Sequence, residues 1–208
     1  IISYPSIDKG KIIIKNYDEK KKDDNYITNE INAHNSEIVA LIMNYDGSLV
    51  ASASIKGTII RIFKTNNGDI IQELRRGTES AEIYCLNFDF HSMNIACSSN
   101  KGTIHIFNIK NDEKNNEVQN QKSYIGSVIS FLGYQSQYLN SEWSFAKYRL
   151  NCKDRSIVCF SPDNSSSVIV ITSDGYYHQG TFDPKVGGEG STSLEKNILE
   201  LEIEKEES

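Results

Sequence analysis

Short runs of apolar and β-branched residues alternate with polar turns along most of this chain. Runs of this kind lie near 37–44, 48–54, 58–63 and 69–74. Each is about four to eight residues long, which suits a strand better than a helix. The turn between the second and third runs contains Gly57, and glycine readily adopts the positive φ that a tight hairpin requires. The pattern therefore predicts a four-stranded antiparallel sheet and an all-β fold.

One segment of this pattern is repeated. Residues 51–59 read Ala-Ser-Ala-Ser-Ile-Lys-Gly-Thr-Ile, and residues 96–104, which lie 45 positions later, read Ala-Cys-Ser-Ser-Asn-Lys-Gly-Thr-Ile. Similar glycine turns occur at 8–12 and at 173–178. A spacing of about 40–45 residues is typical of the four-stranded blade of a WD-type β-propeller. The aromatic residues that end the third strand of each copy are predicted to pack between blades, namely Phe63, Phe107 and Phe182.

The repeat predicts blades near 1–31, 32–75, 81–150 and 152–203, followed by an acidic tail at 204–208. These amount to about three and a half to four blades. Four blades can close a small propeller, but seven is the commoner number for this repeat, so the full protein is expected to be seven-bladed. The chain starts mid-pattern at Ile1, which suggests a fragment with further blades before it. The final strand is predicted at Asn197–Ile203, with a helix at Leu194–Leu201 as the alternative.

The third blade contains an insertion at about 110–144, between a strand that ends near Ile109 and the next clear strand at Phe145–Leu150. A connection of this length within a compact fold is usually functional or disordered. Residues 127–139 combine apolar, aromatic and small polar side chains without charge, and at helical spacing they form a rough apolar face. Amphipathic segments of this composition partition into the bilayer interface. The alternative is a core strand with a flexible loop, and 110–122 is interpreted as a solvated linker.

The net charge of −6 is unevenly distributed along the chain. Residues 1–110 contain 13 basic and 13 acidic side chains, whereas Glu189–Ser208 alone contributes −5. General nucleic-acid binding needs a basic face, so this distribution argues against it. The distribution still allows a local cationic site.

The cysteines and histidines show no pattern of a catalytic or metal site. The four cysteines form no Cys-x-x-Cys pair, and Cys85 and Cys97 lie in apolar runs as small core residues. This cysteine usage favours a reducing, cytosolic compartment. The sequence contains no Gly-rich phosphate loop and no nucleophile elbow, and its four histidines are dispersed, so we expect no enzyme activity, metal or cofactor. The sequence contains no run of about 18 apolar residues, so it does not suggest a transmembrane helix.

Two of the five arginines are adjacent, Arg75 and Arg76, at the predicted exit of the second blade. Neighbouring residues on an extended strand point to opposite sides, so the pair is suited to two pockets rather than one. The planar guanidinium fork meets phosphate oxygens in two parallel hydrogen bonds. The alternative is a pair of solvated arginines at the rim.

The arginine pair stands in the motif Leu74-Arg75-Arg76-Gly77. The strand before it carries Ser-Ala-Ser-x-Lys-Gly-Thr, and the strand after it carries Ser-Ser-x-Lys-Gly-Thr-x-His. This arrangement resembles the PROPPIN family, β-propellers that bind polyphosphoinositides. The family hallmark is Phe-Arg-Arg-Gly, and Leu74 retains the apolar anchor. The resemblance runs from about His34 to Pro184, is strongest over 34–109, and returns at Trp143 and Asp174-Gly175.

The resemblance implies two lipid headgroup sites that flank the second blade at the rim. The first headgroup site would use His34, Ser52, Ser54, Gly57, Thr58, Arg61 and Arg75. The second headgroup site would use Arg76, Gly77, Ser99, Thr103 and His105. These sets offer many hydrogen-bond donors and no competing carboxylate, and Gly57 and Gly77 would let a phosphate approach the backbone. If both histidines line the sites, their protonation should strengthen binding between about pH 7.5 and 6.

Each residue also has a structural alternative. His34 can be the structural histidine of an ordinary WD repeat, His105 a satisfied core histidine, and Arg61 a partner in an inter-blade ion pair. Serine and threonine hydroxyls in a blade turn often satisfy the hairpin backbone. The joint pattern across two blades favours the lipid interpretation.

The resemblance further implies a membrane-recruited adaptor without catalysis. The insertion would enter the bilayer through Ile129, Phe131, Leu132, Tyr134, Tyr138 and Leu139. The expected ligands are phosphatidylinositol 3-phosphate and the 3,5-bisphosphate, and the expected partners are autophagy or membrane-traffic proteins. We expect a cytoplasmic monomer recruited peripherally to autophagosomal, endosomal or vacuolar membranes. The competing hypothesis is a WD-repeat scaffold that binds only proteins and needs neither the arginine pair nor the insertion.

Overall fold

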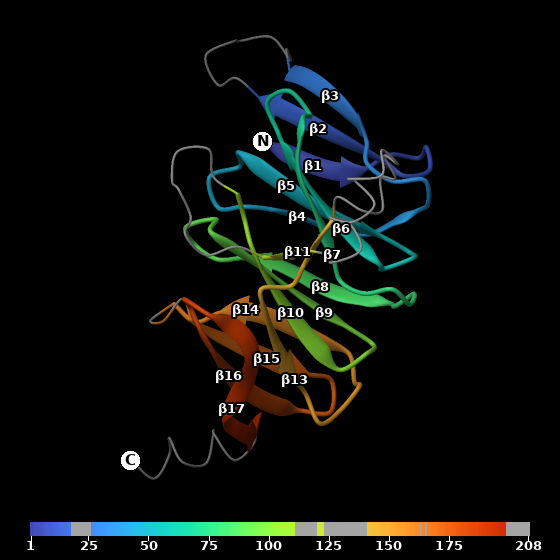
Figure 1. Cartoon of the computed structure of the whole chain (residues 1–208). Coiled ribbons are helices and arrows are strands. Elements are labelled where there is room, and N and C mark those ends of the chain that lie inside the picture. The colour runs from blue at the N-terminus through green and yellow to red at the C-terminus, as the bar shows by residue number, and fades with distance from the viewer. Residues whose placement is uncertain (18–25, 111–119, 123–140, 163, 165, 199–208) are drawn as a thin grey trace, which may run out of the picture.

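The computed structural model describes residues 1–17, 26–110, 120–122, 141–162, 164 and 166–198. Its strands form sheets that stack one after another from the N-terminal to the C-terminal end of the molecule (Figure 1). The first sheet is a three-stranded antiparallel meander of β1 (Ile2–Pro5), β2 (Lys11–Tyr17) and β3 (Tyr26–Asn32). The predicted all-β propeller fold is confirmed.

The second sheet corresponds to the sequence pattern most closely. Its strands are β4 (Ile38–Met43), β5 (Leu49–Ser54), β6 (Ile59–Lys64) and β7 (Ile70–Arg75), in the order of an antiparallel meander. All four predicted strands are confirmed to within one residue at each end. We call this sheet blade 2, and the sheets before and after it blades 1, 3 and 4.

Blade 3 consists of β8 (Ile83–Phe88), β9 (Asn94–Ser99), β10 (Thr103–Asn108) and β13 (Ala146–Arg149). Blade 4 consists of β14 (Ser156–Phe160), β15 (Ser167–Thr172), β16 (Tyr176–Asp183) and β17 (Gly187–Asn197). The outer strands β13 and β17 also pair in parallel, with Ala146 opposite Gly188. Blades 3 and 4 are therefore joined in one hydrogen-bonded sheet of eight strands.

The last described strand begins earlier than predicted, and residues 199–203 of the predicted strand lie outside the described residues. The fourth strand of blade 4 is β17, which begins ten residues before Asn197 and pairs with β16 along most of its length. The helix proposed at Leu194–Leu201 is also wrong over Leu194–Asn197, which belong to this strand. Most side chains of β17 are polar and partly or fully exposed, so the apolar pattern that reveals the inner strands is missing from it. The tail at 204–208 lies outside the described residues.

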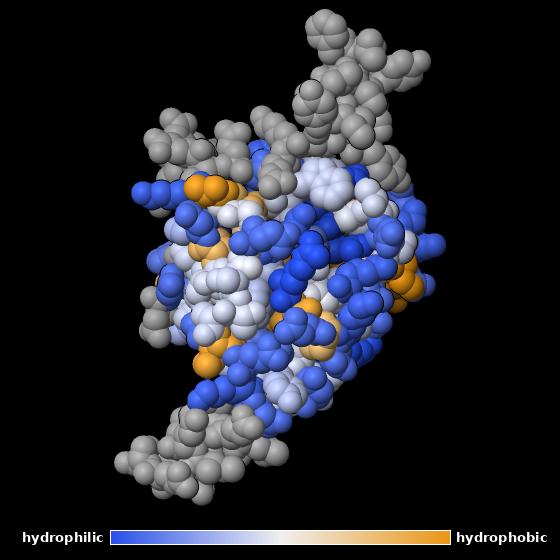
Figure 2. Space-filling model, turned by 60° about the horizontal axis from the view of Figure 1, so that its bottom comes forward, coloured by the Kyte–Doolittle hydropathy of each residue, from blue (hydrophilic) through white to orange (hydrophobic). Residues whose placement is uncertain are grey.

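The hydrophobic core lies between successive blades rather than within any one of them. Phe63 packs with Ile12 and Ile14 of blade 1. Phe107 packs with Ile60 and Ile62 of blade 2, and Phe182 packs with blade 3 residues such as Ile104. The predicted inter-blade packing of these aromatics is confirmed. On the face seen in Figure 2, hydrophobic atoms form only small patches separated by hydrophilic side chains.

The repeated Lys-Gly turn is a contact point between neighbouring blades. A Cβ atom on Gly57 would lie 1.8 Å from the carbonyl oxygen of Ala81, at the start of blade 3. The corresponding distances are 1.8 Å from Gly10 to the oxygen of His34 and 2.6 Å from Gly102 to the oxygen of Cys152. Backbone therefore packs directly on backbone at each blade junction, and only glycine leaves room for it.

The insertion of blade 3 contributes two short strands to the neighbouring blade. β12 (Glu142–Trp143) pairs in parallel with β7, and β11 (Gln121–Lys122) pairs with β12. The sheet of blade 2 therefore extends outward in the order β4-β5-β6-β7-β12-β11. The predicted bilayer-entering residues, Ile129 to Leu139, lie outside the described residues. In the part of the chain that the structure describes, no helix has the length and hydropathy to span a bilayer.

Candidate functional site

Arg75 and Arg76 lie at the end of β7 and are largely inaccessible to solvent. Their exposed fractions are 8% and 5%, so the alternative of two solvated rim arginines is wrong. Arg75 Nε donates a hydrogen bond of 2.8 Å to Ser141 Oγ, from the end of the insertion. Arg76 instead reaches toward the junction of blades 2 and 3, where Nε donates to the carbonyl oxygen of Gly57 at 2.8 Å.

The charge of Arg76 is buried without a described counter-ion. Its second described acceptor is the carbonyl oxygen of Glu79, and it makes no ion pair with any residue that the structure describes. Burial lowers the pKa of the Arg76 guanidinium, and burial raises the pKa of the nearby Cys97 thiol to about 12, so the cysteine stays neutral beside it. A buried, uncompensated cation is costly and stabilises any anion that reaches it.

The structure brings together only some of the residues predicted for the first headgroup site. His34 Nε2 lies 3.0 Å from Ser52 Oγ, and Arg61 Nη1 donates to the carbonyl oxygen of Ala33 at 2.6 Å. Ala33 and Arg61 line a cleft of about 710 Å³ between the rims of blades 1 and 2. The hydrogen bond to the fully buried Ser52 is also what a structural WD-repeat histidine would make.

A carboxylate competes for Arg61, contrary to the prediction. Glu73 lies directly opposite Arg61 in the β6–β7 pair, and its Oε2 accepts from Arg61 Nε at 2.8 Å. The ion pair proposed as the alternative role of Arg61 therefore exists, but within blade 2 rather than between blades. The other carboxylate oxygen of Glu73 is buried without a hydrogen-bond partner among the described residues. Arg61 is thus a neutralised cation in this cleft.

The remaining predicted residues of the first site lie around the β5–β6 turn. Ser54 is buried and Thr58 is half-buried. The carbonyl oxygen of Gly57 accepts a hydrogen bond from Arg76 Nε, so this residue contacts the arginine predicted for the second site. The carbonyl oxygen of Thr58 accepts from the backbone nitrogen of Arg76 at 3.0 Å. Two carbonyl groups of this turn, those of Gly57 and Thr58, therefore hold Arg76 in position.

The residues predicted for the second headgroup site gather around His105 and Arg76. His105 is buried, and its Nδ1 lies 3.2 Å from Ser144 Oγ, just after β12. Ser99 is buried with its Oγ accepting from the backbone nitrogen of Lys101, and Thr103 is half-buried at the start of β10. A Cβ on Gly77 would meet nothing within 4 Å, so close packing within the chain does not require glycine there.

Both histidines are neutral near physiological pH. Burial, assisted by the Arg61 charge, lowers the pKa of His34 to about 4. Burial, assisted by the charges of Arg76 and Lys147, lowers the pKa of His105 to about 3. Neither imidazole titrates between pH 7.5 and 6 in the unliganded protein, so the predicted strengthening of binding over that range loses its basis.

The depressed pKa values instead predict acid sensitivity. An unfolded histidine binds its proton near pH 6.5, whereas these two bind it near 4 and 3 when folded. The unfolded state therefore takes up more protons between these values, and the free energy of unfolding falls as pH drops through this range, by on the order of 3 kcal/mol for each histidine. Chemical unfolding at pH 7 and at pH 5 measures the first part of this loss, about 2 kcal/mol for each histidine.

The variants His34→Gln and His105→Asn should each flatten this pH dependence, and His91→Gln, which replaces an exposed histidine, is the control. An unchanged slope in both variants would contradict the assignment.

One surface group has the composition of a metal site. Cys152, Asp154 and Asp174 bring ligand atoms within 4.8 Å of one another, but both aspartates are exposed. Burial raises the pKa of the Cys152 thiol, which keeps it protonated near neutral pH. The group therefore supports no metal assignment.

Four residues near the arginines were not identified from the sequence, namely Glu73, Ser141, Glu142 and Ser144. Glu73 could have been found from the register of the β6–β7 hairpin, which places it opposite Arg61. The other three come from the end of the insertion, beside the Trp143 that belongs to the family pattern. Their role depends on a strand pairing with blade 2 that no local pattern indicates.

Comparisons with known proteins identify the family. A sequence model of the PROPPIN family matches residues 1–198. "Autophagy-related protein 18e" of Arabidopsis thaliana is 36% identical over 159 residues, which cover 76% of this chain and 41% of that protein. "WD repeat domain phosphoinositide-interacting protein 2" of Xenopus laevis is 34% identical over 186 residues, covering 85% of this chain and 42% of that protein.

A solved structure shares the fold. "Kluyveromyces lactis Hsv2 complete loop 6CD" superposes with a TM-score of 0.73 at 20% identity, covering 92% of this chain and 57% of that one. The chain spans about half the length of the curated relatives it matches. The family match extends over nearly the whole chain, including all four glycine turns and the arginine pair. The chain therefore belongs to the PROPPIN family.

Proposed function

We propose that this chain forms the lipid-recognising part of a phosphoinositide-binding adaptor. Its ligands are phosphatidylinositol 3-phosphate and phosphatidylinositol 3,5-bisphosphate, bound at two headgroup sites on either side of the Arg75-Arg76 pair. Family membership supports this function, as do the names of the relatives in Arabidopsis and Xenopus, which refer to autophagy and to phosphoinositides. The adaptor acts by binding rather than by catalysis.

The buried charge of Arg76 is the observation that carries the proposal. Its described partners are two neutral carbonyl groups, one of them on the rigid glycine turn between blades 2 and 3. This environment fixes the guanidinium without an ion pair to any described residue, and the exposed Glu79 carboxylate, which pairs with Lys101, compensates its charge only in part. A phosphate group supplies the missing negative charge and accepts charge-assisted hydrogen bonds from an arginine that is already oriented.

Membrane recruitment results from several weak lipid contacts that are held on one rigid frame. Two headgroup sites raise each other's effective concentration at the membrane, and an inserting segment would add a third contact. The residues proposed to insert are Ile129, Phe131, Leu132, Tyr134, Tyr138 and Leu139. The cytoplasmic protein would thereby be recruited to autophagosomal, endosomal or vacuolar membranes as a monomer and would bring autophagy or membrane-traffic proteins with it.

Flotation with lipid vesicles tests the proposal directly. The protein should float with vesicles containing phosphatidylinositol 3-phosphate or the 3,5-bisphosphate, at least about tenfold more than with vesicles containing only unphosphorylated phosphatidylinositol. Vesicles of equal charge made with phosphatidylserine control for non-specific attraction. Equal recovery with all vesicles, or none with any, would favour the competing WD-repeat scaffold that binds only proteins.

A further inference from the structure

The end of the insertion runs alongside the first arginine of the pair. β12 pairs with the last two residues of β7, with Glu142 opposite Leu74 and Trp143 opposite Arg75. Blade 3 therefore contributes the strand that borders Arg75, although Arg75 itself belongs to blade 2. The surroundings of Arg75, which is predicted to belong to the first headgroup site, are in this way built from two blades.

Ser141 holds the Arg75 side chain from the end of the insertion. Its Oγ accepts from Arg75 Nε at 2.8 Å, and both residues are buried, at 3% and 8% exposed. A hydrogen bond at Nε constrains the rotation of the guanidinium plane about the end of the side chain. A planar fork recognises phosphate only when its plane faces the ligand, so a fixed plane favours binding.

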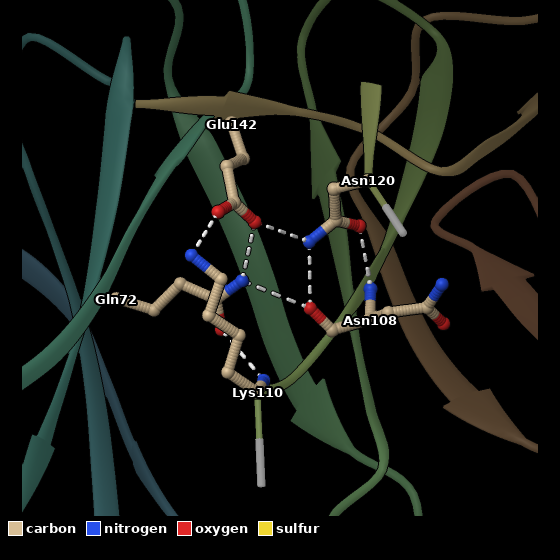
Figure 3. Close-up of polar contacts among 5 residues, drawn as sticks. All are labelled: Gln72, Asn108, Lys110, Asn120 and Glu142. Carbon is tan, nitrogen blue, oxygen red and sulfur yellow. Dashed lines mark hydrogen bonds and ion pairs between the residues drawn. The ribbon is translucent and has the colours of Figure 1, made fainter. Parts of the chain in front are cut away.

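A polar network fixes the position of Ser141 through its neighbour Glu142. In Figure 3 the side chains of Gln72 and Asn120 converge on the Glu142 carboxylate, with hydrogen bonds of 2.7 and 3.0 Å to Oε2. The same two amides also donate to the carbonyl oxygen of Asn108, at 3.1 and 2.7 Å. The other oxygen of Glu142 forms an ion pair with Lys110.

The network joins three segments that are far apart in the sequence. Gln72 lies on β7, Asn108 ends β10 just before Lys110 begins the insertion, and Asn120 and Glu142 lie further along the insertion. Burial raises the pKa of the Glu142 carboxyl, but hydrogen bonds from Lys110, Asn120 and Gln72 outweigh burial and leave the pKa below its usual value. The carboxylate therefore stays charged and engaged near neutral pH.

We propose that Ser141 is a positioning residue for Arg75 in headgroup recognition, and that the network of Gln72, Asn120 and Glu142 holds it in place. This inference rests on the proposed function, since it assigns a role within the first headgroup site. Recognition by Arg75 then depends on the base of the insertion, independently of any contact that the insertion makes with lipid. The second site does not depend on Ser141, because Arg76 is fixed by Gly57 and Glu79 instead.

A comparison in two backgrounds tests the inference. Arg76→Thr keeps Arg75 and removes the arginine of the second site, whereas Arg75→Thr keeps Arg76 and leaves the first site only Arg61, which is already paired with Glu73. Ser141→Ala should weaken binding to vesicles containing phosphatidylinositol 3-phosphate roughly tenfold in the Arg76→Thr background, and by less than about twofold in the Arg75→Thr background. Ser141→Thr retains the hydroxyl and should restore most of the loss.

Ser98→Ala is the matched control for Ser141→Ala. Ser98 is fully buried, and its Oγ donates to the carbonyl oxygen of Ser156 at 2.8 Å, so the control also removes one buried hydrogen bond. It should leave vesicle binding unchanged in both backgrounds. An equal loss from Ser141→Ala in both backgrounds, or no loss in the Arg76→Thr background, would overturn the positioning role.

A second readout does not involve lipid. The Nε–H proton of Arg75 should exchange slowly with solvent by NMR, and Ser141→Ala should accelerate this exchange at least about tenfold. Glu142→Ala should produce the same acceleration and lower the melting temperature by several degrees, whereas Glu189→Ala, which removes an exposed ion pair, should do neither. Unchanged exchange would refute the positioning role, whereas accelerated exchange without any lipid binding would refute only the proposed function.

Discussion

Replacing Arg75 and Arg76 together by threonine should lower the affinity for vesicles containing phosphatidylinositol 3-phosphate by at least about 100-fold. In the proposed function each arginine belongs to a separate headgroup site, and two sites on one rigid frame reinforce each other at a membrane. Each single replacement should therefore cost roughly tenfold, because the other site still binds. Vesicle flotation across a range of lipid concentrations measures all three variants.

The matched control also removes two arginine charges, but at positions away from the Arg75-Arg76 pair. Arg149 and Arg155 are exposed, at 73% and 74% of their side-chain surface, and form ion pairs with Glu189 and Glu82. Replacing both by threonine should change binding by less than about twofold, since exposed ion pairs contribute little. A comparable loss in this control would mean that net charge, rather than the two sites, determines membrane binding.

Gly57→Ala should lower the free energy of unfolding by about 2–4 kcal/mol. Gly57 has a φ of +61°, and an added Cβ would lie 1.8 Å from the carbonyl oxygen of Ala81. The new methyl group must therefore push blade 3 away from blade 2, and the carbonyl that fixes Arg76 moves with it. Urea unfolding measures the stability loss, and vesicle binding by the folded fraction should fall as well.

Substitutions at two other glycines distinguish the two possible causes of this stability loss, the positive φ of Gly57 and its contact with blade 3. Gly175 has a φ of +88°, but a Cβ there would meet nothing within 4 Å, so Gly175→Ala should cost only about 1 kcal/mol. Gly77 has neither constraint, and Gly77→Ala should leave stability unchanged to within about 0.5 kcal/mol. Equal losses from Gly57→Ala and Gly175→Ala would show that backbone conformation, not contact between the blades, dominates.

The inner strands could be predicted because their signal is local. Residues 48–54 and 58–63 are apolar runs bounded by turns, and the repeat at 96–104 marks the same unit one blade later. β17 was placed too late because it is a polar outer strand, and β-strands with two largely exposed faces carry no hydrophobic period. All four strands of blade 2 thus follow from the sequence, whereas the polar outer strand of blade 4 does not.

The candidate site was predictable in its residue types but not in its electrostatics. The motif identified Arg75 and Arg76, yet their burial results from the packing of whole blades. The pairing of Arg61 with Glu73 follows from a hairpin register that could have been worked out beforehand. The contact between Gln72 and Glu142 could not, because it joins residues 70 positions apart through a strand of only two residues.

The pairing of β12 with β7 also affects how this protein avoids self-association. The outermost strand of a propeller blade exposes a row of unpaired backbone groups, and such an edge can recruit a strand from another molecule. In blade 2 the backbone beside Leu74 and Arg75 is already paired with β12. β13 is likewise paired with β17 at Ala146 and Lys147. Two neighbouring blades therefore protect part of their open edges with parallel partners from this same chain, which leaves less edge for aggregation at the surface that carries the arginine pair.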